Sequence, residues 1–307
     1  MIKNGGFPYS LFCTLYESCV SSISDYAGEV FGFNEFDAEM KLHLRAIRSF
    51  LGVCKSTAHS GLLSEFNILL PHYRTQLRMI RYYHRMLKCQ TNVLAKKIFI
   101  WDRNLNKNNV VRSWHSEIEQ IFSENDMSVV FESDSIFPLR ETISRLQSKM
   151  LSRQQLQLKN DCLNLPKLRT FNQLKDFHST PAYITKHLSF VQRKFIAKLR
   201  LGCLGIRIET GRYSRPRIPP ESRICQICRN VELRIEDEFH FLFECRAYEH
   251  LRAIWLSGLD PQPNVVIETR EILLSNVINK ANNVKRTAQY IIDLFDLRSK
   301  LLNNVNG

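Results

Sequence analysis

Three cysteines and one histidine between positions 225 and 245 carry the clearest chemical pattern in this 307-residue sequence. Two residues separate Cys225 from Cys228, eleven separate Cys228 from His240, and four separate His240 from Cys245. Structural zinc sites take four thiolate or imidazole ligands in a tetrahedron, and a Cys-x2-Cys pair supplies two of them from one tight turn. The spacing therefore predicts one structural Zn²⁺ per chain, bound by Cys225, Cys228, His240 and Cys245.

The competing interpretation is three buried cysteines and an unrelated histidine, because free cysteine is often buried. Four potential ligands within 21 residues, in a chain whose other cysteines are scattered, favour the metal. A catalytic zinc keeps one position open for water, whereas four protein donors fill this one. We expect Asp237 or Glu238 to accept the second ring N–H of His240. We expect His250 and Cys203, the nearest spare donors, not to be ligands.

Basic residues form the second chemical pattern. The net charge is +13 and the isoelectric point is about 9.4, which favours a polyanionic partner, although a basic protein without such a partner has the same composition. Cations recur along one face of a predicted helix at 72–90, and arginines surround an aromatic residue in a predicted loop at 207–223. The candidate nucleic-acid-binding residues are Arg74, Arg78, Arg81, Arg85, Lys88, Arg207, Arg212, Tyr213, Arg215, Arg217 and Arg223. A solvated helix face and a flexible linker are the alternatives.

The elements that would position these residues are predicted to be helices. Apolar residues recur at helical spacing in seven segments: 11–33, 37–50, 72–90, 92–122, 138–160, 183–201 and 281–303. The core candidates in the fourth segment are Trp101, Trp114, Ile118 and Phe122. We expect Arg193, Lys194, Lys198 and Arg200 to lie outside the apolar face of 183–201. With few Gly and Pro, the sequence predicts a mainly α fold: a helical region, a small zinc-stabilised knuckle and a C-terminal helix.

The first residues do not form a signal peptide, and no stretch approaches the roughly 20 apolar residues that a membrane span needs. We therefore expect an intracellular protein, in the nucleus or the cytoplasm, without membrane association. Its nine cysteines are expected to be thiols or metal ligands rather than disulfides.

Several segments resemble the C-terminal region of non-LTR (LINE-type) retrotransposon reverse transcriptases, which ends in a cysteine–histidine segment. Around the predicted zinc site these are AKLRLG at 197–202, IETGRY at 208–213, RICQIC at 223–228 and EDEFHFLFEC at 236–245, followed by Tyr248, Leu251 and Arg252. Upstream they are LYESCVSSISDYAGEVFGF at 15–33, SFLGVCKST at 49–57 and LLSEFNILLP at 62–71. Together these segments span most of residues 11–252.

The resemblance implies a region downstream of the polymerase palm. Four parts are then expected: a helical thumb or post-palm-like region at 1–130, a helical linker at 131–200, the basic loop and zinc knuckle at 201–255, and a tail and helix at 256–307. The acidic segment 123–137 is the expected internal boundary. A polymerase palm holds two metal ions with paired aspartates, and this sequence contains no Asp-Asp pair.

We therefore expect no catalytic activity from this chain and a role in binding template RNA or target DNA, the preference between them being left open. The alternatives are an accessory part of an enzyme that acts with a separate polymerase domain, a protein-interaction scaffold, and a non-functional relic. We also expect metal removal to unfold 223–252 while 11–200 stays folded, because the short segment has few apolar residues.

Overall fold

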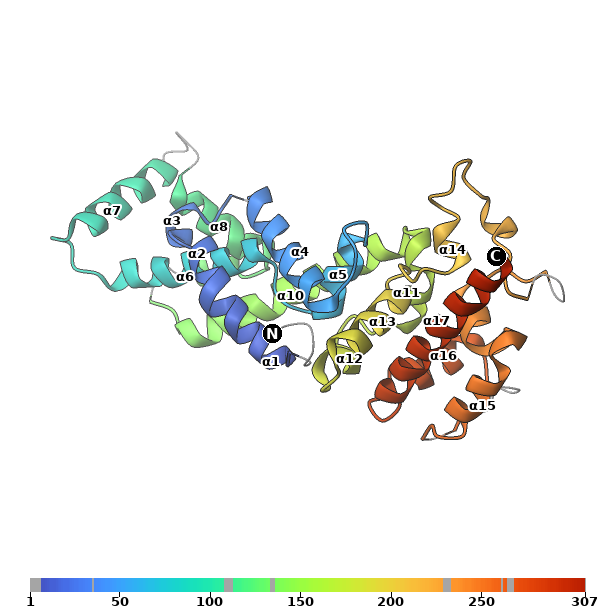
Figure 1. Cartoon of the computed structure of the whole chain (residues 1–307). Coiled ribbons are helices and arrows are strands. Elements are labelled where there is room, and N and C mark those ends of the chain that lie inside the picture. The colour runs from blue at the N-terminus through green and yellow to red at the C-terminus, as the bar shows by residue number, and fades with distance from the viewer. Residues whose placement is uncertain are drawn as a thin grey trace. The chain divides into compact units, whose positions relative to one another are not determined.

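The computed structural model consists of helices joined by loops (Figure 1). It describes residues 7–34, 36–107, 113–132, 136–228, 233–260, 262–263 and 268–306. Across these ranges no strand is present, and one antiparallel bridge joins Ile224 to Ile235. The predicted mainly α fold is confirmed. None of the helices described combines the length and the apolarity needed to cross a lipid bilayer.

Two compact units make up the chain. The first contains Met1–Thr14, Leu44–Asn67 and Leu158–Gly307, and the second contains Leu15–His43 and Ile68–Gln157. The expected boundary in 123–137 lies inside the second unit, and the expected limits near 130, 200 and 255 do not coincide with the limits of either unit. The acidic composition of 123–137 is a local property of the sequence, whereas a unit is defined by contacts between segments distant in sequence.

The second unit contains most of the middle of the chain. Its elements are η1 (Tyr16–Ser21), α2 (Ser22–Ser24), α3 (Gly28–Phe31), the first part of α4 (Asp37–Leu51), α6 (Pro71–Lys88), α7 (Leu94–Lys107), α8 (Trp114–Glu124), α9 (Ser128–Glu132) and most of α10 (Leu139–Leu163). Helix α6 begins with a proline, whose fixed φ suits the first helical position. Its apolar residues Leu77, Ile80 and Tyr83 are buried in one core with residues of α8 and α10, as their spacing predicts.

Helix α3 packs closely on α6 because two glycines face a small side chain. A Cβ atom added to Gly28 would lie 3.0 Å from Cγ2 of Thr75, and one added to Gly32 would lie 3.0 Å from Cβ of Thr75. The hydroxyl of Thr75 lies 3.4 Å from the carbonyl oxygen of Gly32, although its shortest hydrogen bond, of 2.8 Å, is to the carbonyl of His72. The close approach holds the aromatic residues that follow α3 beside α6.

The predicted helix at 92–122 is two helices, α7 and α8, separated by residues that include 108–112, which lie outside the described residues. Ile118 and Phe122 are buried and Trp114 is half-buried, but the prediction of a core position for Trp101 is wrong, since it is 62% exposed. Phe99 is the residue of α7 that enters the core. Trp101, two positions later, turns roughly 200° away around the helix.

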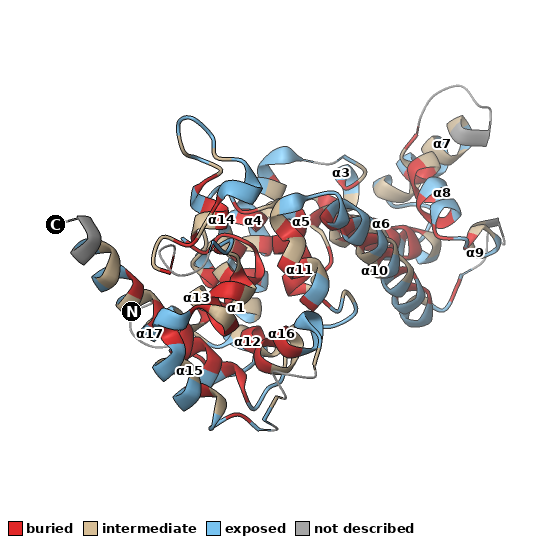
Figure 2. Ribbon diagram, turned by 90° about the vertical axis from the view of Figure 1, so that its right-hand side faces the viewer, coloured by how far each residue is buried: buried red, intermediate tan, exposed pale blue. Residues whose placement is uncertain are grey.

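The first unit contains the remaining elements. They are α1 (Tyr9–Leu15), the end of α4, α5 (His59–Phe66), η2 (Pro166–Leu168), α11 (Arg169–Leu174), α12 (Ala182–Thr185), α13 (Phe190–Arg200), α14 (Arg207–Thr210), η3 (Pro220–Ser222), η4 (His240–Glu244), η5 (Arg246–Tyr248), α15 (Glu249–Leu256), α16 (Arg270–Ile278) and α17 (Val284–Asn306). Helix α13 packs on α17, where the rings of Phe195 and Phe295 are 5.3 Å apart. The predicted C-terminal helix is confirmed, and Figure 2 shows its buried face, which includes Val284 and Ile291.

The segment 183–201 departs from the prediction in two ways. It forms two helices because Ser189 caps α13, its side chain accepting a hydrogen bond from the backbone N–H of Gln192. Two of the four cations expected outside the apolar face are buried. Arg200 pairs with Glu65 at 2.6 Å, and Arg193 donates to the carbonyl oxygen of Phe7. Both partners are more than 100 positions away, so helical spacing could not reveal them.

Candidate metal centre and nucleic-acid interface

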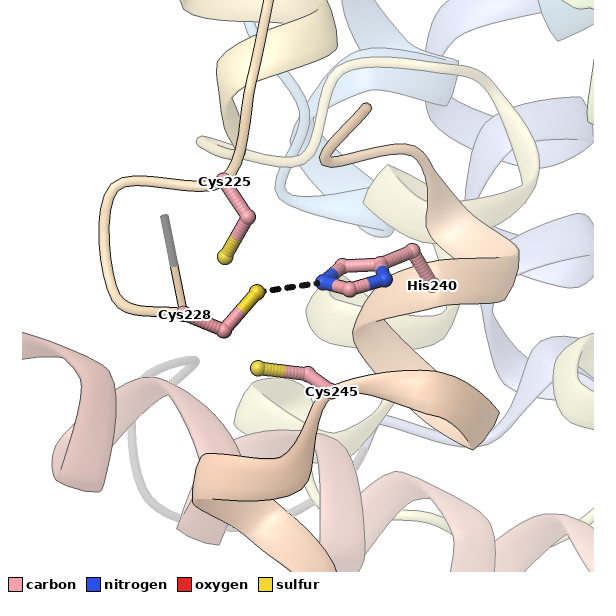
Figure 3. A group of neighbouring side chains, drawn as sticks. All are labelled: Cys225, Cys228, His240 and Cys245. Atoms are coloured by element: carbon pink, nitrogen blue, oxygen red, sulfur yellow. Dashed lines mark hydrogen bonds between the residues drawn. The ribbon is translucent and has the colours of Figure 1, made fainter. Parts of the chain in front are cut away.

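The four predicted zinc ligands converge on one point in the first unit (Figure 3). Their ligand atoms all lie within 4.8 Å of one another, and all four residues are buried. The Cys228 sulfur is 3.4 Å from Nε2 of His240. A zinc ion with bonds of about 2.3 Å to sulfur and about 2.0–2.1 Å to nitrogen would separate these two atoms by about 3.6 Å in a tetrahedron. The donor set and the spacing therefore fit a structural zinc ion.

Local backbone structure explains why the ligands meet. The bridge between Ile224 and Ile235 is flanked by two hydrogen bonds, from the N–H of Cys225 to the carbonyl of Arg234 at 2.8 Å and from the N–H of Glu236 to the carbonyl of Arg223 at 3.0 Å. This narrow hairpin turns the Cys225–Cys228 segment toward η4.

The second pair of ligands flanks a single wide helical turn. His240 begins η4, Cys245 follows it directly, and the N–H of Cys245 donates to the carbonyl of His240 at 2.9 Å. This i→i+5 bond is the π-helical pattern, which brings residues five positions apart to the same side. The Asp237 carboxylate accepts from the backbone N–H of His240 at 2.7 Å and fixes the start of the turn.

The prediction that Asp237 or Glu238 accepts the second ring N–H of His240 is wrong. The nearest acid is Glu244, whose Oε2 lies 3.5 Å from Nδ1. Asp237 is engaged by the backbone, and Glu238 is held by the Arg169 guanidinium at 2.5 Å. The π-helical turn places Glu244 beside the ring, and the sequence spacing alone did not distinguish it from the two earlier acids. His250 and Cys203 are not members of the cluster.

Hydrogen bonding within the metal-free cluster separates the acidities of its thiols. A hydrogen bond from Cys245 lowers the pKa of Cys225 to about 3, whereas burial and the neighbouring Cys225 thiolate raise the pKa of Cys228 to about 11. One thiolate is thus stabilised before metal arrives, and the other thiols must release their protons to solvent when zinc binds.

The knuckle is packed into the first unit more extensively than its few apolar residues suggest. The Arg298 guanidinium of α17 makes two hydrogen bonds, of 2.8 and 2.9 Å, to the buried carboxylate of Glu236. The Tyr290 hydroxyl donates to the carbonyl of Leu242 at 2.8 Å, and the ring of Phe241 lies 5.3 Å from that of Phe295. These contacts tie the metal centre to α17, so the knuckle shares the core of the unit.

Some arginines of the basic loop, residues 207–223, make contacts within the protein, and others are exposed. Arg223 is 1% exposed and donates to the carbonyl oxygens of Ile208 and Ile218, while Arg212 pairs with Glu209 at 3.0 Å. Arg215 and Arg217 are exposed and Arg207 is half-buried. The Tyr213 ring is 60% exposed, and its hydroxyl donates to Glu209 and accepts from Lys167.

The α6 cation row, defined as Arg74, Arg78, Arg81, Arg85 and Lys88, divides in the same way. Arg74 pairs with Asp25 at 3.1 Å and with Glu39 at 3.6 Å. Arg78 reaches both the backbone and the carboxylate of Asp25. Arg81, Arg85 and Lys88 are exposed. The row is present as predicted, but acids from distant sequence neutralise its first part.

A hollow of about 420 Å³ lies along the row in the second unit. Arg78, Arg81, Arg85 and Lys88 line it, and Glu29 is the one acid among the described residues that do so. No function was predicted for the aromatic residues that line a second hollow, which shares Tyr82 with this one. These residues belong to the α3 region, α7 and α8 as well as to α6, and no local pattern in the sequence links these helices.

No protein-family model matches this chain. No curated protein has significant sequence similarity to it. No solved structure is significantly similar to it either.

Proposed function

We propose that this protein binds nucleic acid and uses a zinc ion to hold part of its binding surface in shape. The observation that carries the proposal is the hollow along α6. Its described lining contains Arg81, Arg85 and Lys88, together with Arg78, which also pairs with Asp25, and one acid, Glu29. Arginine side chains can hold a phosphate through two parallel hydrogen bonds, and lysine supplies a point charge. A concave surface with such an excess of cations suits a phosphate backbone better than a solvated helix face, which mixes charges.

The zinc ion in this proposal is structural. Four protein donors converge on it, so no ligand position remains for a substrate or a reactive water. The basic loop leads directly into Cys225, and the buried Arg223 fastens it beside the knuckle. Zinc would therefore maintain the position of Tyr213, Arg215 and Arg217.

The resemblance to the C-terminal region of LINE-type reverse transcriptases supports the same role, in which the chain grips template RNA or target DNA without a catalytic site of its own, in the nucleus or the cytoplasm. A polymerase domain acting in trans would then be a partner. Determining whether the neighbouring genomic sequence encodes a polymerase palm tests this relationship. Primer extension or magnesium-dependent cleavage by the purified chain, abolished by a point substitution within it, would replace the proposal with an enzymatic one.

The binding proposal is tested by measuring affinity for RNA and DNA across a salt series. Replacing Arg81, Arg85 and Lys88 by Gln should weaken binding to all sequences and reduce the slope of log affinity against log salt by about 0.7–0.9 for each phosphate that the variant no longer neutralises. A control with Gln at Lys41, Arg145 and Lys149 removes the same charge from the surface of the same unit. Equal behaviour of the two variants would show that net charge alone, rather than the α6 surface, attracts the polyanion.

A further inference from the structure

A second hollow, of about 520 Å³, lies in the same unit as the cation-lined hollow. Its walls come from the α3 region, α6, α7 and α8, and six of its lining residues are aromatic: Phe31, Phe33, Tyr82, Phe99, Trp101 and Trp114. Phe31 and Trp101 are 54% and 62% exposed. Large apolar side chains gathered around an open hollow mark an interaction site rather than part of a core.

The aromatic hollow and the cationic hollow share a wall. Tyr82 lines both of them. Its ring meets Trp114 edge-on, with centroids 5.9 Å apart, and the Arg85 guanidinium lies over the ring, 4.6 Å from its centroid. A ligand that crosses Tyr82 therefore passes from clustered rings to a row of cations.

Hydrogen bonds hold Trp114 in place before any ligand arrives. The indole N–H of Trp114 donates to the carbonyl oxygen of Glu29 at 3.0 Å. The Asp102 carboxylate, which also lines the aromatic hollow, accepts from the backbone N–H groups of Trp114 and His115 at 3.1 and 2.8 Å. Its charge is thus directed at the start of α8, where a helix favours an anion. Glu117, the other acid of the hollow, is buried.

We propose that the two hollows form one groove for single-stranded nucleic acid, in which unpaired bases stack against the aromatic rings while adjoining phosphates lie on Arg81, Arg85 and Lys88. This inference rests on the proposed nucleic-acid binding and specifies its form. Unpaired bases expose their flat faces to aromatic side chains, whereas a duplex keeps those faces stacked. The charge of the adjoining wall selects the occupant, because a purely apolar partner would leave those cations without counter-charges.

The test uses the full-length, zinc-loaded protein and two strands of equal length and phosphate number, an oligodeoxythymidylate and an abasic analogue. Tryptophan fluorescence reports on the groove directly: Trp101 and Trp114 line it, whereas Trp255 belongs to the other unit and is 2% exposed. We expect thymidylate to quench this fluorescence and to bind at least about fivefold more tightly than the abasic strand, since each stacked base contributes about 1–3 kcal/mol.

Variants locate the effect. Trp101→Ala should weaken thymidylate binding at least about fivefold and leave abasic binding unchanged, while Trp101→Phe, which keeps a ring, should restore most of the affinity. Tyr26→Ala, which removes a ring that is 85% exposed elsewhere in the same unit, is the matched control and should have no effect. Because Trp101 is largely exposed, its truncation removes little core packing.

Three results would overturn the inference. Equal affinity for the two strands without quenching would leave phosphate binding, and hence the proposed function, intact while excluding base stacking in the groove. No binding of either strand would refute both proposals. If an acidic amphipathic peptide displaced thymidylate from the protein, and the two strands bound with equal affinity, the groove would be a protein-docking site instead.

Discussion

Helix α6 and the basic loop use similar cations in different ways. In the loop, the fully buried Arg223 serves as an internal hydrogen-bond donor to backbone carbonyls, and Arg212 pairs with Glu209. In α6, the ion pairs with described residues lie in the first half of the helix, where Arg74 and Arg78 meet Asp25. The later cations of α6 line one hollow, whereas the loop exposes Arg215 and Arg217 on a segment between two short helices.

The difference shows that the availability of a cation depends on which acids and carbonyls the fold brings to it. A buried arginine needs hydrogen-bond acceptors for the N–H groups of its guanidinium. A loop that folds back on itself can provide them with its backbone carbonyls. A helix satisfies its own carbonyls internally, so its arginines find acceptors on other segments or remain exposed. We therefore expect the loop to depend on the metal and α6 to be independent of it.

Zinc removal should have the largest effect, and it should separate the two regions. Structural zinc binds small zinc peptides with an apparent free energy of about 10–16 kcal/mol at neutral pH, and the affinity falls as the pH is lowered because the ligands are protonated. We expect chelation or Cys228→Ser to abolish hydrogen-exchange protection in the basic loop and knuckle. Protection in α17 should also fall, since Arg298 and Phe295 pack on the knuckle.

Protection in α6 should persist after zinc removal, because α6 belongs to the other unit. Cys19→Ser, which alters an exposed cysteine of that unit, is the control and should change neither metal content nor exchange. Equal loss of protection in α6 would show that the two units unfold together. Unaltered metal content in Cys228→Ser would refute the ligand assignment.

Arg223→Ala should produce the next largest effect. It removes a buried guanidinium and leaves the carbonyl oxygens of Ile208 and Ile218 without their donor, which should lower the free energy of unfolding of the zinc-loaded protein by about 3 kcal/mol. Arg217→Ala, an exposed change in the same loop, should alter it by no more than about 0.5 kcal/mol. Denaturant titrations measure both. Similar values for the two variants would contradict the structural role of Arg223.

Substitutions along α6 should separate stability from binding. Arg74→Gln leaves the buried Asp25 and Glu39 carboxylates without their strongest counter-charge, so we expect about 2 kcal/mol of destabilisation and an unchanged salt dependence of nucleic-acid binding. Arg85→Gln should do the reverse, with unaltered stability and a shallower salt slope. A shallower slope in Arg74→Gln would mean that this arginine leaves its acids to bind phosphate.

Tyr213→Ala tests the loop as a second contact for single strands. The ring is exposed and its hydroxyl is fixed by Glu209 and Lys167, which presents one face at a constant angle. If the ring stacks on a base, affinity for single strands should fall by about 1 kcal/mol or somewhat more, with little change in salt slope. Tyr213→Phe keeps the ring and should bind almost normally. Undiminished binding by the alanine variant would confine base contacts to the α6 region.

The smallest effect concerns the pH dependence of stability near Arg74. Burial, followed by hydrogen bonding to Asp25, raises the pKa of Glu39 from 4.5 to about 7. Ionisation of this carboxyl therefore opposes folding. The stabilisation that the protonated Glu39 gives to the folded state is full below pH 4.5 and is lost as the pH rises through 7. Glu39→Gln should flatten this part of the stability profile, measured as melting temperature at several pH values. An identical profile in the variant would exclude Glu39 as its source.

The sequence alone determined the features that depend on local spacing. Helical periodicity identified α4, α6 and α17 and the apolar residues that they bury, because a helix repeats its faces every three to four residues. The Cys3His spacing identified all four members of the buried cluster, since a short hairpin and one helical turn bring residues within 21 positions together. The mainly α fold followed from the same periodicity.

Only the tertiary structure decided which charged and aromatic side chains are available. Arg200 is buried because it pairs with Glu65, which lies 135 positions away in the sequence. Trp101 is exposed because α7 turns Phe99 toward the core instead, and it lines the hollow that Tyr82 also lines. The limits of the two units were equally hidden, since each unit combines distant segments. Spacing along the chain reports which residues share a face of one element, whereas partners on other elements are set by packing, which no local pattern records.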